Sequence, residues 1–377
     1  MSWTFASPQR TPVHGGRDFP SVRYSASAVE YRGELIVTHG YFYNHQVRHP
    51  GWQSNAWAFN FASRKWRKIH EGEQAGAPSA RYSCSAVLYD NALYMYGGDD
   101  GGHKHSMFNY VFQAWFTELW RFDLRAYSWQ QVRPKGKIPP KRALHGAVAV
   151  GDSMYVYGGL ELADTWRYDF IPQTWTLLVP PPADTDTKDG SHPGRRHAFA
   201  MAAAGQGFFV FGGCRHVRGM RPLAFDDLWH FDISTNTWTK KEPPAESPAH
   251  PSARSHLSLV RLSSNLLMLY GGALCIPGCS CYGDSWLYKI NANSWHSLNA
   301  TNAPIHRFVS TALCPRPRHV PRHEHPAHLH PSLPTPTLIP PFTLRSEPRR
   351  VLLCGVPHPH SPPPSAQVPP KPGGAPA

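Results

Sequence analysis

The sequence predicts an all-β fold in which four-stranded sheets are arranged around an axis as a β-propeller. Three landmarks recur in a fixed order: a phrase that begins with arginine, an apolar run that ends in two glycines, and two tryptophans nine residues apart. The arginine precedes the first glycine by 16 or 17 residues in every unit. Such recurring units, which cannot bury their apolar faces alone, are typical of repeat architectures.

The opening phrase of each unit predicts its first strand, as in RYSASAV and RALHGAV. Five openers begin full units, and a sixth, RFVSTAL, follows the last of them. We expect their arginines to occupy equivalent positions in the fold. These arginines are Arg23, Arg81, Arg142, Arg195, Arg254 and Arg307.

The apolar run that ends in glycine predicts the second strand, as in SMYVYGG. Glycine suits a place where backbones approach closely or φ is positive. The glycine-rich stretch at 97–102 also permits a phosphate-binding loop, but the helix that such a loop needs does not follow it. The first unit departs, with His39 where the first glycine belongs. The glycines are Gly97, Gly98, Gly158, Gly159, Gly212, Gly213, Gly271 and Gly272.

The tryptophans predict the third and fourth strands, joined by a short turn. Aromatic and β-branched residues with turn-forming neighbours favour strands, and no helical period is present. Large flat rings suit the space between packed sheets, so we interpret all ten as structural. The first of each pair are Trp57, Trp120, Trp166, Trp229 and Trp286, and the second are Trp66, Trp129, Trp175, Trp238 and Trp295.

The two ends of the repeat region predict a partial sixth blade. Trp3 precedes Arg23 by 20 residues, as a fourth-strand tryptophan would, and 307–313 matches a first strand. We therefore expect residues 1–313 to form five full blades and a sixth that the N-terminal strand completes.

Residues 314–377 differ in composition, because they contain 19 of the 39 prolines. Proline removes strand donors and little apolar surface is available, so we expect this tail to be disordered. One hypothesis is that an artefact of the gene model has replaced the rest of the sixth blade. The other is a genuine Pro/His-rich tail, in which PPKP at 369–372 suits an SH3-like groove as polyproline II.

Glycine pairs after apolar strands, followed by aromatic phrases and a tryptophan, resemble the kelch repeat over residues 23–295. The resemblance implies a propeller of five to seven blades that serves as a protein-interaction platform. It also implies an alternative, because some kelch propellers are metal-dependent or carbohydrate-modifying enzymes.

The residues themselves favour the non-enzymatic interpretation. The E-x3-D-x3-H pattern of the iron-dependent members is not found, since Glu161 and Asp164 have the wrong spacing and no histidine follows. His145 falls inside an opener and is interpreted as structural. We therefore expect no catalytic set and no cofactor, while the identity of the protein partner and the oligomeric state stay open.

Loops between the second and third strands are the predicted partner-binding segments. Their length varies, because the next repeat tryptophan comes seven residues after Gly159 but 22 after Gly98. Variable loops on a rigid scaffold carry function. The alternative is that their aromatic side chains fold back onto their own blade. The loop at 214–225 is basic, which favours an acidic partner. The alternative is that its basic side chains are only solvated. The candidate contact residues are Trp52, His103, His105, Phe108, Tyr110, Trp115, Arg215, Arg218 and Arg221.

Cysteines and a histidine in the loops of the fourth and fifth units form a weak candidate metal site. Four such ligands can bind zinc tetrahedrally. The spacing in CIPGCSCYG is not a familiar zinc pattern, and a disulfide or free thiols are the alternatives. The candidates are Cys214, His216, Cys275, Cys279 and Cys281.

The net charge of +13 is dispersed and accompanies no nucleic-acid-binding motif, so we expect no nucleic-acid partner. The sequence contains no run of 18 apolar residues of the kind that would predict a membrane span. The N-terminus lacks the apolar segment of a signal peptide, which favours the cytoplasm. A loop disulfide and the sequon at 299–301 would instead suit a secretory compartment.

Overall fold

The computed structural model describes residues 19–21, 23–43, 50–101, 115–182, 190–216, 222–244, 250–274 and 281–298. Within these ranges the regular elements are all strands, and no helix could cross a membrane. Five sheets have four strands each: β1 (Ser27–Tyr31), β2 (Glu34–Thr38), β5 (Ala56–Asn60) and β6 (Lys65–His70); β7 (Ser85–Tyr89), β8 (Ala92–Tyr96), β9 (Leu119–Asp123) and β10 (Ser128–Val132); β11 (Gly146–Val150), β12 (Ser153–Tyr157), β13 (Thr165–Asp169) and β14 (Thr174–Val179); β15 (Ala200–Ala204), β16 (Gly207–Phe211), β19 (Leu228–Asp232) and β20 (Thr237–Lys240); β21 (Ser258–Ser263), β22 (Leu266–Tyr270), β23 (Ser285–Lys289) and β24 (Ser294–Leu298). Two hairpins add β3 (Tyr41–Tyr43) with β4 (Pro50–Trp52), and β17 (Cys214–Arg215) with β18 (Leu223–Ala224).

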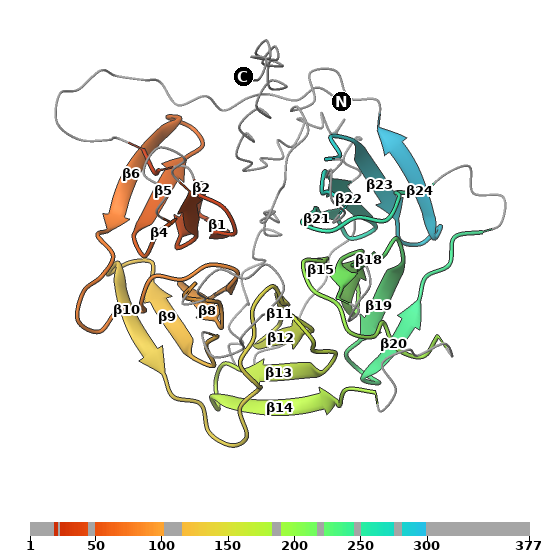
Figure 1. Cartoon of the computed structure of the whole chain (residues 1–377), viewed down its shortest axis with the longest axis horizontal. Helices are drawn as coiled ribbons and strands as arrows, with labels where there is room; N and C mark the ends of the chain where they lie inside the picture. The colour runs from red at the N-terminus through yellow and green to blue at the C-terminus, as the bar shows by residue number, and fades with distance from the viewer. Residues whose placement is uncertain are drawn as a thin grey trace, which may run out of the picture.

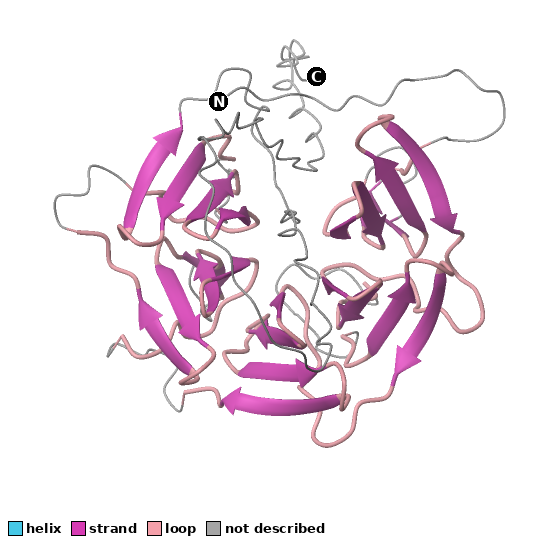
Figure 2. Ribbon diagram, turned by 180° about the vertical axis from the view of Figure 1, so that it is seen from behind, coloured by secondary structure: helices cyan, strands magenta, loops and turns pink. Residues whose placement is uncertain are grey.

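The five sheets are the blades of a propeller, as the repeat predicts. Figure 1 shows them side by side around a common centre, with β1, β11, β15 and β21 innermost, and Figure 2 shows the same arc from behind. Consecutive inner strands contact one another from β1 through β7, β11 and β15 to β21. The partial sixth blade, with Trp3 and 307–313, and the tail at 314–377 lie outside the described residues.

Antiparallel order places the connections of every blade on two opposite faces. The turns between strands one and two and between strands three and four lie on one face. The loops between strands two and three lie on the other face, together with the connections that lead to the next blade. We call this second face the loop face. Both hairpins, β3–β4 and β17–β18, belong to it.

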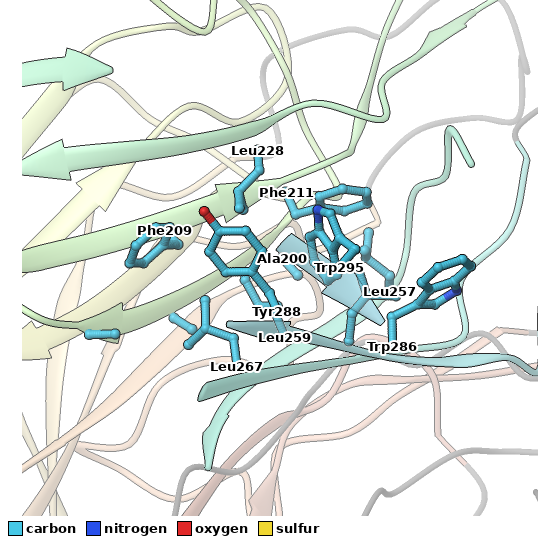
Figure 3. Close-up of a cluster of buried hydrophobic side chains, with 13 residues drawn as sticks. Ala200, Phe209, Phe211, Leu228, Leu257, Leu259, Leu267, Trp286, Tyr288 and Trp295 are labelled. Atoms are coloured by element: carbon cyan, nitrogen blue, oxygen red, sulfur yellow. The ribbon is translucent and has the colours of Figure 1, made fainter. Parts of the chain in front are cut away.

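The fourth-strand tryptophans pack between blades. Trp175 contacts Tyr96 of the preceding blade, Trp238 contacts Tyr157, and Trp295 contacts Phe211, with ring centroids 4.8–5.2 Å apart. Figure 3 shows the last of these interfaces, where Phe209 and Phe211 of β16 face Tyr288 and Trp295. Each blade therefore buries its apolar surface mainly against its neighbour.

The first unit has His39 in place of the first glycine of the pair, and this side chain takes part in the packing between blades. The ring of His39 meets Trp129 edge-on, with centroids 5.5 Å apart, next to the small side chain of Thr38. In later units the aromatic residue before the glycine pair occupies this interface. His39 has a φ of 60°, so the first blade keeps the backbone conformation that glycine serves elsewhere.

Two backbone hydrogen bonds recur at every described blade interface. The second glycine donates its amide to the carbonyl of the next opening arginine, at 2.8–3.0 Å: Gly40 to Arg81, Gly98 to Arg142, Gly159 to Arg196 and Gly213 to Arg254. In the fourth blade Arg196 occupies this position, one residue after the predicted Arg195. The residue two after each opening arginine donates to its counterpart in the preceding blade, at 2.7–3.1 Å: Ser83 to Ser25, Leu144 to Ser83, Ala198 to Leu144 and His256 to Ala198. The opening phrase thus joins neighbouring blades around the central axis.

Candidate partner-binding face

In each of the five described blades one arginine of the opening phrase is buried beneath the loop face and holds the start of a loop. In the third blade, Arg142 donates to the carbonyl of Gly158 and, through both terminal nitrogens, to the carboxylate of Asp164, each at 3.0 Å. The same carboxylate accepts a 2.6 Å hydrogen bond from Nε1 of Trp166. Arginine, carboxylate and tryptophan therefore form one buried unit that connects three segments of the blade.

The acidic partner recurs two residues before the first tryptophan of a blade. It is Glu118, Asp164, Asp227 or Asp284 in blades two to five, and Asn55 takes its place in the first blade. The sequence analysis missed these residues, although an acid at that spacing in four of five units was a visible signal. A buried guanidinium needs a compensating charge, which is the physical reason for the pattern.

In the fourth blade the structure corrects the predicted arginine by one residue. Arg196, with its side chain 1% exposed, bonds to the carbonyl of Gly212 and the carboxylate of Asp227. The side chain of Arg195 is 41% exposed and lies 3.6 Å from Glu161. Arg196 precedes Gly212 by 16 residues, the same interval as in the first three units, so only Arg196 reaches both partners.

An aromatic ring covers the guanidinium in three blades. Phe116 lies over Arg81, Phe225 over Arg196 and Tyr282 over Arg254, at 3.7–4.2 Å from ring centroid to guanidinium carbon. Each ring stands two residues before the acidic partner, at the end of a loop. Stacking of this kind is favourable where water is excluded, and it fixes the end of each of these loops.

A cluster of four partly exposed aromatic side chains lies on the loop face where blades one and two meet. The ring of Trp52 stacks on Tyr82 with centroids 5.4 Å apart and planes 8° apart. Tyr41 lies 4.9 Å from Trp52 and 5.8 Å from Tyr82, and Tyr24 lies 6.3 Å from Tyr41. We call these four residues the aromatic cluster. Its members come from both blades, so it exists only in the folded chain.

The sequence places the three tyrosines of the aromatic cluster next to buried residues. Tyr24 and Tyr82 directly follow opening arginines, Tyr41 follows Gly40, and Trp52 ends β4. Backbone hydrogen bonds of 2.6 and 2.9 Å pair Tyr24 with Tyr41. Of the four, sequence reasoning identified only Trp52. The RYS phrase, which occurs only in the first two units, was the signal for two of the tyrosines.

A family model described as the KLHDC2/KLHL20/DRC7 Kelch-repeats domain matches residues 2–186 and 116–317. The chain belongs to this Kelch-repeat family.

The curated relatives agree with the family. Kelch domain-containing protein 2 of Bos taurus is 27% identical over 277 residues, which are 68% of this chain and 63% of that protein. Kelch domain-containing protein 10 of Xenopus laevis is 24% identical over 315 residues, 80% of this chain and 70% of that protein. The N-(sulfonatooxy)prop-2-enimidothioate sulfolyase of Thlaspi arvense is 28% identical over 189 residues, 48% of this chain and 49% of that protein. The match to the first of these spans less than two thirds of its length. The Kelch fold and the Kelch domain-containing relatives support a general role as a protein-interaction scaffold.

The structure places only some of the predicted contact residues of this Kelch propeller. Trp115 is buried: it packs against Ala143 and Leu160 of the third blade and donates from Nε1 to Asp99 of its own blade at 3.0 Å, so its packing is not confined to its own blade as the self-packing alternative had it. Arg215 lies in β17 opposite Leu223. The other predicted residues outside the described ranges are His103, His105, Phe108, Tyr110, Arg218, Arg221 and Arg307.

The predicted cysteine and histidine group is described only in part. Sγ of Cys214 lies 3.3 Å from Nε2 of His197, and the ring of His216 stacks on His197 at 4.9 Å. Cys281 lies in the fifth blade beside Ala273. Within the part of the chain that the structure describes, no three potential ligands are placed to hold a metal. Cys275 and Cys279 lie outside it, so zinc, disulfide and free thiols remain predictions.

Buried histidines are expected to make the stability of the Kelch propeller depend on pH. Burial, together with the nearby His216 and His256, lowers the pKa of His197 from 6.5 to about 3. Burial, and next to it the positive charges of Arg81 and Arg23, also lowers the pKa of His39 from 6.5 to about 3. The unfolded chain binds these protons at higher pH than the folded chain does. The contribution of these groups to stability is therefore complete above pH 6.5 and is lost as the pH falls toward 3.

We expect acidification from pH 6.5 to pH 5 to lower the free energy of unfolding by about 2 kcal/mol for each of these histidines. Urea denaturation at the two pH values measures the loss. The His197→Gln variant, which has one titrating ring fewer, should lose about 2 kcal/mol less than the wild type. An identical loss in both proteins would contradict the assignment to His197.

Proposed function

We propose that this Kelch propeller binds a partner protein through the aromatic cluster on its loop face. The observation that carries the proposal is the Trp52–Tyr82 stack across the junction of two blades, at 5.4 Å and 8°. Tyrosine and tryptophan dominate interface hot spots, because they combine a large apolar surface with a polar group. All four side chains of the cluster are partly exposed.

The scaffold beneath the aromatic cluster supports this role. Arg81 bonds to Glu118 at 2.7 Å directly beside Tyr82, and Arg23 bonds to Asn55 at 2.9 Å directly beside Tyr24. At Gly101 a Cβ atom would lie only 2.0 Å from the ring of Trp52, so the glycine lets the ring approach the backbone. Side chains held in this way lose little conformational entropy when a partner binds.

The chemistry of the cluster favours an extended segment of the partner with apolar side chains, proline included. One stacked and three tilted ring pairs, at centroid distances of 4.9–6.3 Å, form a continuous aromatic surface against which such side chains pack. Aromatic-lined surfaces recognise polyproline II segments by this mode. Tyrosine hydroxyl groups at the margin provide hydrogen bonds to the backbone of the segment.

Selection of peptides from a random display library against the purified protein would test the proposal. For selected peptides, Trp52→Ala should raise the Kd at least about 30-fold, the effect of a hot-spot residue. Leu223→Ala is the matched control, because Leu223 is a 45% exposed apolar residue on the same face in another blade, and it should change the Kd less than about twofold. Thermal unfolding confirms that both variants fold. Selected peptides whose Kd is unaffected by Trp52→Ala would contradict the proposal.

A further inference from the structure

The β3–β4 hairpin of the first blade is part of a small antiparallel sheet on the loop face. Tyr24 pairs with Tyr41 of β3, and Tyr41 lies opposite Trp52 of β4. Tyr24 therefore lies at one edge of this small sheet, and β4 lies at the other. Among the described residues, no strand or bridge pairs with β4 on the side away from β3. Trp52, a member of the aromatic cluster, thus belongs to an edge strand.

The main chain of Trp52 faces this open edge. In an antiparallel sheet, the N–H and the C=O of one residue point toward the same neighbouring strand. Tyr41 exchanges both groups with Tyr24, at 2.6 and 2.9 Å, so it does not bond to Trp52. The amide of Gln53 donates to the carbonyl of Gly40 at 2.9 Å, which is the bond expected beside a non-hydrogen-bonded pair. The N–H and C=O groups of Trp52 therefore point away from β3.

These two groups have no hydrogen-bond partner in the part of the chain that the structure describes. Backbone groups that are shut off from water nearly always have a partner, so on the partly exposed Trp52 they are expected to be open to solvent. Pro50 agrees with this, because its nitrogen has the same orientation as that of Trp52, and proline is found where the nitrogen of an edge strand faces solvent. Of the three residues of β4, only Trp52 offers an N–H at this edge.

The fourth blade has a similar edge without the aromatic surface. Ala224 of β18 corresponds to Trp52, and the amide of Phe225 donates to the carbonyl of Gly213 at 2.9 Å. The N–H and C=O of Ala224 therefore also point outward. Ala224 presents only a methyl group beside them, whereas Trp52 presents the indole ring of the aromatic cluster. An open edge and an aromatic surface thus coincide at Trp52.

We propose that an extended segment of the partner protein binds as an added antiparallel strand at the free edge of β4. One residue of the segment, here called the central residue, exchanges two hydrogen bonds with the N–H and C=O of Trp52. This binding mode rests on the proposed function, and it specifies the conformation in which the partner is bound. In strand addition the main-chain hydrogen bonds give affinity, and alternate side chains give specificity.

The pairing with Trp52 assigns a role to each position of the segment. The side chain of the central residue lies beside the indole, with its Cβ about 5 Å from that of Trp52. The central residue is not proline, because its N–H donates to Trp52. Its two neighbours turn their N–H groups away from β4, so proline is tolerated there. Sensitivity to the loss of an N–H group is therefore expected to alternate along the segment.

N-methylation of a peptide tests this mode of binding. The probe is the tightest-binding peptide from the display selection whose Kd depends on Trp52, and each of its residues is N-methylated in turn. Against the purified full chain, methylation of the central residue should raise the Kd at least about tenfold, because a hydrogen bond is lost. Methylation of either neighbour, the matched control, should change the Kd less than about twofold. An ester in place of the central amide removes the N–H without adding a methyl group and should raise the Kd about threefold or more.

Hydrogen exchange measured by NMR gives a second readout on the protein itself. The amide of Trp52 should exchange at least about tenfold more slowly with saturating peptide, while the amide of Ala224 should exchange at an unchanged rate. A response to methylation that does not alternate along the peptide, or an unprotected Trp52 amide, would overturn strand addition. A Kd that is still raised by Trp52→Ala would in that case leave the proposed function standing. If no selected peptide depends on Trp52, both are wrong.

Discussion

Replacing Asp164 with alanine is expected to lower the free energy of unfolding by about 3–5 kcal/mol. The substitution leaves the guanidinium of Arg142 buried without its counter-charge, and it removes the acceptor of the Trp166 indole. Both charged side chains of the pair are almost wholly buried, with 0% and 5% exposure, so water does not replace the lost carboxylate. Urea denaturation of the purified variant measures the loss.

Two further variants make this prediction specific. Glu71→Ala breaks the exposed Lys68–Glu71 pair and should cost less than about 1 kcal/mol, because solvent screens exposed ion pairs. The Arg142→Met/Asp164→Leu variant removes both buried charges and should recover much of the stability that Asp164→Ala loses. A loss below about 1 kcal/mol for Asp164→Ala would show that Asp164 does not compensate the buried charge of Arg142.

Replacing Gly213 with alanine is expected to lower the free energy of unfolding by about 3 kcal/mol or more, from backbone strain and overlap together. Gly213 has a φ of 91°, and a Cβ atom would lie 2.8 Å from the carbonyl oxygen of His197 and from Cβ of Phe199. Its amide also donates to Arg254 of the next blade at 2.8 Å. A shift that relieved the overlap would therefore weaken the contact between blades four and five.

The matched control lies in the same blade. Gly205 also has a positive φ, of 61°, but a Cβ atom there would meet nothing within 4 Å. Gly205→Ala should therefore cost only about 1 kcal/mol, from backbone strain alone. Thermal and urea unfolding of both variants measures the difference. Equal losses at the two positions would mean that the overlap with His197 and Phe199 contributes nothing.

The repeat made the blade structure predictable because its signals are local. Strands alternate with turns at short range, so the interval between arginine, glycine and tryptophan reflects the length of each strand and turn. The interpretation as packing between sheets is confirmed for the fourth-strand tryptophans of blades two to five, since a ring such as Trp295 buries well only against a second blade. The acidic residue represented by Asp164 recurs as regularly in the sequence, but it was not predicted. Its role as a counter-charge is evident only once the structure shows that the arginine is buried.

The adjacent arginines show where sequence spacing was insufficient. Arg195 and Arg196 fit the opener phrase equally well, and burial decided between them. Strand direction orients neighbouring side chains oppositely, so a shift of one residue exchanges a buried guanidinium for an exposed one. His39 is a similar case, since only the position of Trp129 shows why an imidazole replaces glycine there.

The sequence by itself determined the fold class, the five described blades, and the identity of the residues that pack them. It determined these because each unit encodes its own strands and turns in consecutive residues. Only the tertiary structure decided which side chains from different blades meet: Trp52 with Tyr82 on the loop face, and His145 with Ser85 between blades two and three. Such contacts join residues far apart in the chain, and their geometry depends on how the blades dock through the inter-blade hydrogen bonds.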